Sequence, residues 1–278
     1  TTFSNSATAM YSSSTTYAGE NNTVQNCTMS TRSGSPGPTA GVFINGSSSR
    51  YTSNPTNNTI KGNTIENFYY YGMYTTYTNG DQFVNNDISR ANATSHNMSA
   101  TGMACYASYT YSTNRSTKIE GNYIHDIPFA GATNTGPSTF YGVYAIYNYG
   151  NATYRYVVEK NRIENMYSGN MYAGYHLYNT NIHIHANKVS NWKAATSHYG
   201  WYNLYNSGTT LVNKNETTDC YSTSTSYGIV CAYGSDQVEI SENIFKRNQF
   251  CQTTSTSYTL PGVALRICFN HQPVRVTK

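Results

Sequence analysis

Charged residues are scarce in this chain, and long apolar runs are absent. Only 11% of the 278 residues are Asp, Glu, Lys or Arg, against about 25% in an ordinary soluble domain. This scarcity does not indicate disorder, because 14% of the residues are aromatic and disordered chains have few aromatic side chains. No run of Lys and Arg offers a track for a phosphate backbone, so we expect no nucleic-acid partner. No stretch of about 18 apolar residues occurs either, so we expect no membrane insertion.

Short motifs that mark metal, redox and hydrolytic sites are also missing. None of the six cysteines lies in a C-x-x-C pair, so we expect neither a zinc site nor a thioredoxin-type site. The Gly-x-Ser-x-Gly elbow does not occur, and we expect no cofactor. The cysteines suit disulfides in an oxidising compartment or buried free thiols. The chain opens at Thr1 without a signal peptide, so we expect a processed protein or part of a longer one, and we infer secretion from composition alone.

A repeat runs through what is present instead, chiefly Asn, Ser, Thr, Gly and Tyr. A β-branched residue, a short gap, Asn, any residue and an apolar residue recur, and the copies begin at Val24, Ile60, Val84, Ile119, Val158, Ile184, Val212 and Ile240. A second marker is a glycine before an apolar or aromatic residue, at Gly41, Gly72, Gly102, Gly142, Gly174, Gly200, Gly228 and Gly262. The two markers alternate without exception, which predicts a repeat protein.

Each repeat predicts short strands that stack. Alternation of apolar and polar residues, as in Ile182-His183-Ile184-His185, is strand geometry. A short strand cannot bury its apolar side alone, so we expect equivalent strands to stack about 4.8 Å apart. The repeated Asn suits a turn because it tolerates left-handed backbone angles, and stacked Asn side chains can hydrogen-bond along the ladder. Asn26 belongs to the first, partial copy, and we expect it to be buried in this ladder.

This pattern resembles the right-handed parallel β-helix repeat family, which includes pectate lyases, polygalacturonases and repeat regions of large bacterial surface proteins. The resemblance covers roughly residues 20–268 and implies an all-β, right-handed parallel β-helix of about eight coils. We expect one domain over residues 1–278, with 1–20 as a partial first coil or cap and 269–278 as a terminal tail. Open solenoid ends expose strand edges, so we expect a flanking domain or partner to cap at least one end.

Aromatic residues fall where the strands after each glycine should face outward. The residue after the glycine should point inward and the next one outward, which gives Phe43, Tyr74, Ala104, Tyr144, His176, Tyr202, Val230 and Ala264. A second row faces outward only if a bend intervenes, and consists of Tyr77, Tyr147, Tyr205 and Tyr233. We predict ligand binding by Tyr74, Tyr77, Tyr144, Tyr147, Tyr202 and Tyr205, through stacking of sugar rings or contact with a protein. The alternative is that the rings stack only on each other.

An ionisable cluster offers an enzymatic alternative. Glu120, Glu159 and His185 occupy one position in three consecutive repeats. A further outward row beyond the turn consists of Tyr123, Arg162 and Lys188. Two carboxylates about 5 Å apart can form a retaining glycosidase pair, and His183 and His185 can join carboxylates around a metal ion. Against this, outward charged residues on strands are usually solvated, and the Asp-Asp and Gly-His-Gly signatures of polygalacturonases do not occur.

These patterns predict a non-catalytic structural or adhesion module, either secreted or at the cell surface. Its expected ligand is an extracellular glycan or a surface protein, bound through the aromatic face or through inserted loops. The alternative function is a polysaccharide lyase or glycoside hydrolase that uses Glu120, Glu159, His185, Arg162 or Lys188. Fold resemblance does not decide between them, because one fold hosts many functions. An ice-binding solenoid has little support, because it needs a regular Thr ladder.

Overall fold

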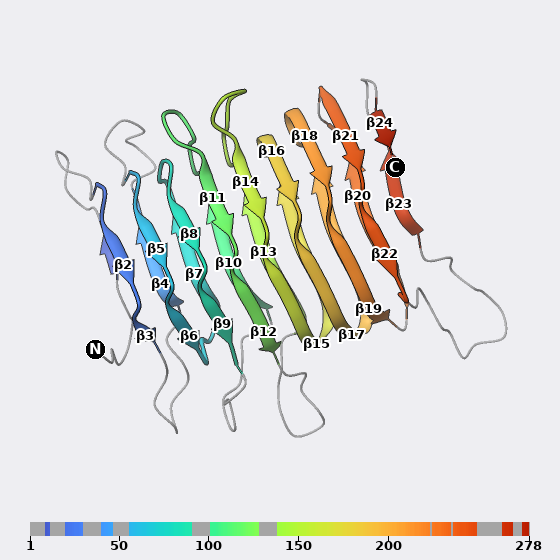
Figure 1. Cartoon of the computed structure of the whole chain (residues 1–278), viewed down its shortest axis with the longest axis horizontal. Coiled ribbons are helices and arrows are strands. Elements are labelled where there is room, and N and C mark those ends of the chain that lie inside the picture. Colours follow the sequence, from blue (N-terminus) through green and yellow to red (C-terminus); the bar gives the residue numbers. More distant parts are fainter. Residues whose placement is uncertain are drawn as a thin grey trace.

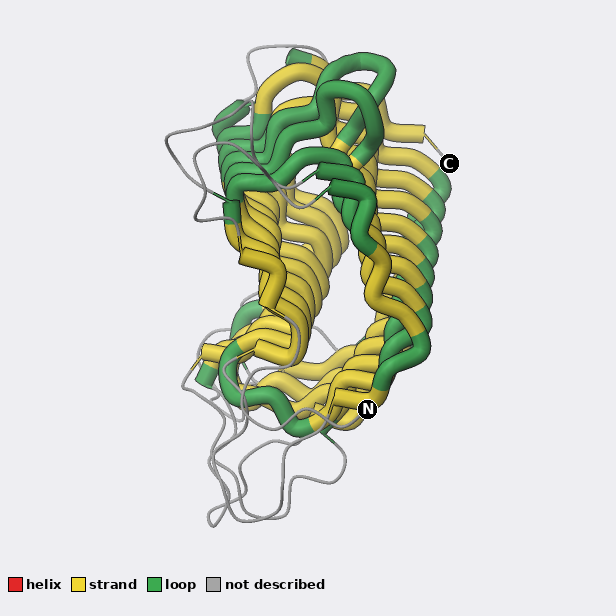
Figure 2. Tube along the Cα trace, turned by 90° about the vertical axis from the view of Figure 1, so that its left-hand side faces the viewer, coloured by secondary structure: helices red, strands yellow, loops and turns green. Residues whose placement is uncertain are grey.

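All regular elements that the structure describes are β-strands. The computed structural model describes residues 9–11, 20–29, 40–46, 56–90, 101–127, 138–222, 224–234, 236–248, 263–268 and 274–277. Its strands pair in parallel and form two sheets, of 15 and 9 strands. Seen end-on, the chain encloses a long, nearly closed ring (Figure 2). The fold is therefore all-β, and the stacked parallel strands are consistent with a parallel β-helix.

The chain passes through three strand positions in a constant order, and we call one such pass a coil. The 9-stranded sheet contains β2 (Thr23–Gln25), β5 (Thr59–Lys61), β8 (Gln82–Val84), β11 (Thr117–Glu120), β14 (Tyr156–Glu159), β16 (Thr180–His185), β18 (Ser207–Asn213), β21 (Gln237–Ser241) and β24 (Val274–Thr277). The same strands lie side by side along the molecule (Figure 1). Each strand pairs only with its neighbours in the stack, and the pairs keep equivalent residues of successive coils side by side.

The 15-stranded sheet has two branches that β15 (Arg162–Leu177) and β17 (Lys188–Leu204) join, since both strands continue around the corner. One branch contains β1 (Ala9–Tyr11), β4 (Ala40–Asn45), β7 (Tyr71–Thr76), β10 (Thr101–Ser108), β13 (Thr139–Ile146), β20 (Ser226–Ala232) and β23 (Val263–Cys268). The other contains β3 (Thr28–Met29), β6 (Thr64–Glu66), β9 (Asp87–Ser89), β12 (Tyr123–Ile127), β19 (Glu216–Ser222) and β22 (Ile244–Lys246).

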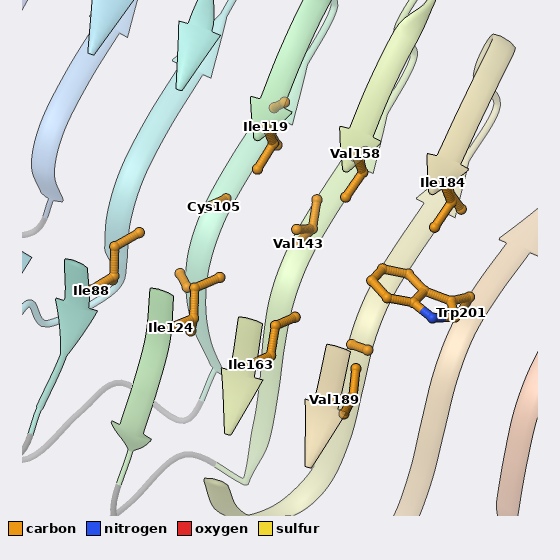
Figure 3. Close-up of a cluster of buried hydrophobic side chains, with 14 of the residues drawn as sticks. Ile88, Cys105, Ile119, Ile124, Val143, Val158, Ile163, Ile184, Val189 and Trp201 are labelled. Atoms are coloured by element: carbon orange, nitrogen blue, oxygen red, sulfur yellow. The ribbon is translucent and has the colours of Figure 1, made fainter. Parts of the chain in front are cut away.

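The interior is filled by rows of apolar side chains, one from each coil. Ile119, Val158 and Ile184 of the 9-stranded sheet are fully buried and face the row of Ile124, Ile163 and Val189 across the interior (Figure 3). Burial of one such aliphatic side chain is worth about 1.5–3 kcal/mol. The β-branched residues of the sequence repeat are thus the core, as their periodicity predicts, except that Val24 and Val84 are only partly buried and Phe83 takes the place of Val84 in the row.

An asparagine ladder closes one corner of the coil, as the repeat predicts. Its members are Asn63, Asn86, Asn122, Asn161, Asn187, Asn215 and Asn243. Each backbone N–H donates to the Oδ1 of the next Asn at 2.9–3.1 Å. Each amide Nδ2 also donates to a backbone carbonyl of the preceding coil, as from Asn187 to Val158. The ladder therefore satisfies backbone groups that the turn would otherwise leave unpaired.

Two details of the ladder differ from the prediction. The left-handed backbone belongs to the residue before the ladder Asn, such as Lys160 before Asn161, and not to the Asn itself. In the first copy Asn26 takes this left-handed position and is exposed, and Cys27 occupies the ladder position instead. The expected burial of Asn26 is therefore wrong. The ladder Asn is selected for its amide, which bonds backbone atoms above and below it, and not for its backbone preference.

A second ladder consists of small residues at a bend in the branch that contains β7 and β13. Gly72 illustrates the reason for small size, since a Cβ there would lie 2.6 Å from the Ala104 carbonyl oxygen and 2.7 Å from Ile88 Cγ2. Ala104 stands level with Gly72, and Ala173 stands level with Gly142. Of the seven glycine markers within the described residues, two are consequently out of register: Gly102 precedes the ladder position by two residues and Gly174 follows it by one.

Candidate binding face with three tyrosine columns

A seven-residue pattern, Tyr-x-x-Tyr-x-x-Tyr, recurs in the branch that contains β7, β13, β15 and β17. It is complete in residues 71–77, 141–147, 172–178 and 199–205, and two further copies lack one Tyr each, in 103–109 and 227–233. A spacing of three keeps every Tyr on one surface because the strand bends at the small residue, where two consecutive residues face inward. Gly142 and Val143 are such a pair between Tyr141 and Tyr144.

In the first column the rings from Tyr141 to Tyr227 stack on one another, with Met103 between Tyr71 and Tyr141, and the second column stacks ring upon ring from Phe43 to Tyr202. The first column holds Tyr71, Tyr141, Tyr172, Tyr199 and Tyr227. The second holds Phe43, Tyr74, Tyr106, Tyr144, Tyr175 and Tyr202. Ring centroids in the second column are separated by 4.6–5.5 Å with interplanar angles of 9–18°. Rings of the two columns meet edge to face, as Tyr172 and Tyr175 do at 5.3 Å.

The third column lies at the turn that follows the strand. Its members are Tyr77, Tyr109, Tyr147, Tyr178, Tyr205 and Tyr233, and all six have left-handed backbones with φ between 49° and 59°. Their centroids stack at 4.8–5.1 Å. The bend that the sequence required for this row to face outward is thus present, and Tyr178, Tyr205 and Tyr233 are 40%, 43% and 46% exposed. The three columns together are called the tyrosine face below.

The rings of the tyrosine face cover one another's flat sides. Tyr109 is stacked between Tyr77 and Tyr147, and Tyr175 between Tyr144 and Tyr202. Offset or tilted ring pairs of this kind are favourable by about 0.5–1.5 kcal/mol each. Within a column, therefore, the surface consists of ring edges and the outer ends of the side chains. The predicted stacking of sugar rings on flat aromatic surfaces does not fit this arrangement.

Burial and neighbouring phenols raise the pKa of several tyrosines of the face. Burial, followed by the neighbouring phenols Tyr175, Tyr141, Tyr106 and Tyr71, raises the pKa of Tyr144 to about 12. The pKa of Tyr74 is raised to about 12 by burial, by Tyr106 and Tyr71, and to a smaller extent by Tyr77 of the third column. These mutual effects mean that the hydroxyl groups of adjacent columns lie near one another. The three columns form a single surface.

The sequence correctly placed several tyrosines in the outward-facing rows and missed others. Tyr74, Tyr144 and Tyr202 share the second column, and Tyr77, Tyr147 and Tyr205 share the third. Ala104 and His176 were expected to face outward, but both are fully buried. Their places in the second column belong to Tyr106 and Tyr175, because the glycine markers of these coils are out of register. Val230 is in register with the column but buried, and the Ala264 side chain lies outside the described residues.

Glu120, Glu159 and His185 do lie in register on β11, β14 and β16 of the 9-stranded sheet. Lys118 Nζ joins the two carboxylates, at 3.3 Å from Glu120 Oε2 and 3.0 Å from Glu159 Oε1. Lys160 Nζ also lies 3.2 Å from Glu120 Oε1. Burial acts to raise the pKa of Glu120, but the two lysines outweigh it and hold the pKa below its usual value. A general acid needs a raised pKa, so this ion-paired cluster has the properties of a surface salt-bridge network.

Arg162 and Lys188 lie on a different sheet from these carboxylates, in the row that begins with Tyr123. The Arg162 guanidinium is paired with Glu164, with Nε and Nη2 each 2.7 Å from a carboxylate oxygen. It also lies 4.8 Å from the centroid of the Tyr123 ring, whose hydroxyl donates to Glu164. The five residues named for catalysis are therefore divided between two sheets. The carboxylates of one sheet are paired with lysines, and Arg162 of the other is paired with Glu164.

The histidines of the cluster have hydrogen-bond partners of their own. His183 Nε2 and His185 Nδ1 lie 3.0 Å and 2.7 Å from Asn213 Oδ1. Among the described residues, no three His, Cys, Asp or Glu side chains come together in a way that could hold a metal ion. Elsewhere, His125 lies between Asp87 and Asp126 at 2.8 Å and 2.7 Å, so both of its ring nitrogens face a carboxylate.

Buried polar groups occupy the interior behind the tyrosine face. His176 is fully enclosed, and burial lowers its pKa to about 3, which keeps the ring neutral. Cys105, Cys220 and Cys231 are buried free thiols, and burial raises the pKa of Cys231 to about 12. A thiol of this kind is unreactive. Cys105 and Cys231 both face the interior, so the buried-thiol interpretation of the cysteines holds for them. Cys251 lies outside the described residues.

Comparison with known proteins adds no family to this geometry. No family model, no curated protein and no solved structure matches the chain. The described residues also include no helix of sufficient length and apolar character to cross a membrane. Functional inference therefore depends on the site itself.

Proposed function

We propose that this chain is a non-catalytic binding module, secreted or displayed on a cell surface, and that the tyrosine face contacts its ligand. The expected ligand is an extracellular glycan or a surface protein. The proposed architecture is a right-handed parallel β-helix of about eight coils, because crossovers between parallel strands are right-handed almost without exception. A flanking domain or partner is expected at one end or both, since solenoid ends expose strand edges.

The observation that carries this proposal is the third column. A left-handed backbone costs a residue other than Gly, Asn or Asp roughly 1–2 kcal/mol, yet six successive coils place Tyr there. Each inner ring of the column has two stacked neighbours, which together contribute about 1–3 kcal/mol, an amount comparable to the backbone cost. The Asn-ladder corner accepts Lys, Ala and Glu in the same backbone conformation, so the turn itself does not require tyrosine. Exposed tyrosine also combines a large contact area with a polar group at low entropic cost.

The test compares two corners that share one backbone conformation. In one variant, Tyr178→Asn, Tyr205→Asn and Tyr233→Asn are combined. In the matched control, Lys160→Asn, Ala186→Asn and Lys214→Asn place the same residue at left-handed positions of the Asn-ladder corner. Binding to immobilised extracellular polysaccharides and to cell-envelope proteins is measured by pull-down and by surface plasmon resonance.

We expect the control to bind as the unaltered chain does and the tyrosine variant to lose binding by roughly tenfold or more, which corresponds to loss of about 1.4 kcal/mol. Equal binding by all three proteins would exclude the tyrosine face as the contact surface. A polysaccharide panel is also followed for reducing ends and for unsaturated uronides. Turnover that depends on Glu120 or Glu159 would replace the binding module with the enzymatic alternative.

A further inference from the structure

The tyrosine face repeats one set of groups at the strand spacing. Its third column places one phenol ring in each of six coils, and the ring centroids of adjacent coils are 4.8–5.1 Å apart. A ligand with a similar repeat can bring the same group opposite every ring in turn. A compact ligand would contact only one or two coils and would make no use of the rest. The geometry is therefore suited to an extended polymer that runs along the stack.

The face is also uncharged. Among its described side chains, from Phe43 to Tyr233, none is Asp, Glu, Lys or Arg. Burial and mutual proximity keep phenols such as Tyr141 and Tyr144 protonated, with pKa values raised to about 12. Charged polymers bind where opposite charges can pair with them. A neutral ligand is therefore favoured over an acidic polysaccharide or a nucleic acid.

The chemistry of the exposed groups further restricts the class of ligand that can bind. Phenol hydroxyls both donate and accept hydrogen bonds, as the alcohol groups of sugars do. In three of the six coils, Ile146, Leu177 and Leu204 lie partly exposed between the second and third columns, so a short apolar strip runs beside the phenol groups, as apolar and polar groups do on the faces of a sugar chain. An extended peptide is less suitable, because the strand backbones here are already paired with neighbouring coils and offer no edge for strand addition.

We infer that the tyrosine face binds a neutral, extended β-linked polysaccharide that lies along the stacking axis, with about one sugar residue opposite each coil. Contact is made by ring edges, phenol hydroxyls and the aliphatic strip, and not by stacking on ring faces. This inference rests on the proposed binding function and specifies the ligand of that same surface. It predicts that affinity rises with oligosaccharide length until the coils of the third column are all engaged.

The probes are β-1,4-linked gluco-oligosaccharides of two to six residues, with α-1,4-linked gluco-oligosaccharides of equal length and polygalacturonate as controls. Dissociation constants are measured by isothermal titration calorimetry on the full chain. We expect Kd to fall with each added β-linked residue, and much weaker binding of the α-linked series, whose curved chain cannot follow the columns. Equal affinity for the two series, or affinity independent of length, would overturn the inference.

Hydroxyl recognition is tested with phenylalanine. Tyr178→Phe, Tyr205→Phe and Tyr233→Phe together remove three hydroxyls and retain the ring stack. Tyr156→Phe is the control, because its hydroxyl is buried in the interior and has no hydrogen-bond partner among the described residues. We expect the triple variant to bind the β-linked hexamer at least roughly tenfold more weakly, since three hydrogen bonds to the ligand are lost, and the control to bind normally. Unchanged binding by the triple variant would overturn hydroxyl recognition.

The remaining outcomes separate this inference from the function on which it rests. If the Tyr→Asn variant loses binding to a protein or an acidic glycan while neutral β-glycans never bind, the tyrosine face is a binding surface and the assigned ligand is wrong. If sedimentation shows that the unaltered chain self-associates and the same variant does not, the face packs against a second copy of the chain, and the assignment of a glycan ligand is again wrong. If no tyrosine substitution alters any interaction, the proposed function fails as well.

Discussion

Several corners of the coil hold a residue in the left-handed backbone region, and the Asn-ladder corner and the tyrosine corner differ in which residues they accept. At the Asn-ladder corner the position is occupied by Gly62, Asn85, Gly121, Lys160, Ala186, Lys214 and Glu242, with φ from 52° to 65°. At the tyrosine corner six successive coils all have Tyr, with φ from 49° to 59°. The backbone requirement is therefore nearly the same, and only one corner restricts the side chain.

The residue after the left-handed position shows that the two corners share their backbone chemistry. Asn187 follows Ala186 and accepts from the backbone N–H of Asn161 at 2.9 Å. Asn179 follows Tyr178 and accepts from the backbone N–H of Asn148 at 3.0 Å. Turn geometry thus explains the amides at both corners but does not explain the tyrosines. Substitutions at the two corners can therefore separate the contribution of the tyrosine side chains to stability and binding from the contribution of the turn.

The largest effect is expected where the two corners should agree. Asn187→Leu removes a buried amide that bonds Asn161 and the Val158 carbonyl, and buried groups without partners cost about 1–3 kcal/mol each. We expect the free energy of unfolding to fall by about 3 kcal/mol or more, measured by chemical denaturation. Asn179→Leu at the tyrosine corner should cost a similar amount. A large difference between the two would show that the backbone roles of the corners are not equivalent.

A third corner contains a carboxyl group in place of the ladder amide. Asn22, Asn58 and Asp81 occupy equivalent positions in successive coils. The Asp81 Oδ1 accepts hydrogen bonds from the backbone N–H and the side-chain amide of Asn58, at 3.0 Å and 3.2 Å. Burial raises the pKa of Asp81 to about 6, although hydrogen bonds from Thr78, Asn58 and Thr75 act to lower it. The folded chain thus holds this proton at a pH where the unfolded chain has released it.

The sign of the pH effect follows from that difference. Between about pH 4 and pH 6 the folded state binds more protons than the unfolded state, so stability falls as pH rises through this window. We expect Asp81→Asn to remove this slope and to stabilise the chain by roughly 2 kcal/mol above pH 7, while the ladder bonds to Asn58 are retained. Thermal unfolding of both proteins between pH 4 and pH 8 is the measurement. Parallel profiles for the two proteins would contradict the assignment.

Ala186→Gly tests the backbone cost at the Asn-ladder corner by itself. Glycine adopts positive φ without the steric penalty of a Cβ, and Ala186 has φ of 52°. We expect a stabilisation of up to about 1 kcal/mol, because part of the relief is offset by the greater freedom of glycine in the unfolded chain. Denaturant midpoints give the difference. Destabilisation by this substitution would mean that the left-handed turn is not strained.

Tyr205→Gly makes the same backbone change at the tyrosine corner, where the net effect on stability should be the smallest. It relieves the same strain but removes the stacked contacts with Tyr178 and Tyr233, each at 5.1 Å. Two such contacts contribute about 1–3 kcal/mol, so we expect a net change within about 1 kcal/mol of zero, with a clear loss of ligand binding. A stabilisation as large as that of Ala186→Gly would show that the stack contributes nothing.

The sequence predicts the stacked strands well and the binding face only in part. The repeated β-branched residues and Asn define core and ladder, and both are found in place except in the repeats of Val84 and Asn26, where Phe83 and Cys27 occupy these positions. The outward rows were counted from glycine, and the count fails where Ala104 and Ala173 occupy the small-residue position in place of glycine. Tyr106 and Tyr175 were missed for this reason. The seven-residue Tyr spacing was visible in the sequence, but alternation with a period of two cannot reveal it, because the strand bends between the tyrosines.

The ionisable cluster shows a further limit of sequence reasoning. Register alone correctly placed Glu120 beside Glu159, since both follow the same marker in consecutive repeats. The effect of Lys118 could not be anticipated, because its ammonium reaches a carboxylate 41 residues away as well as one on its own strand. Side-chain reach across coils, and the resulting direction of the Glu120 pKa, depend on how neighbouring strands are packed.

By itself, the sequence determined that this chain forms stacked parallel strands with an asparagine ladder, because each repeat has too little apolar surface to fold alone and must pair with its neighbours. Tertiary structure decided which tyrosines share a surface and how their rings are turned. Stacking at the strand spacing brings one ring against the flat side of the next, so edges and hydroxyls face outward. That orientation arises between coils, and no single repeat contains it.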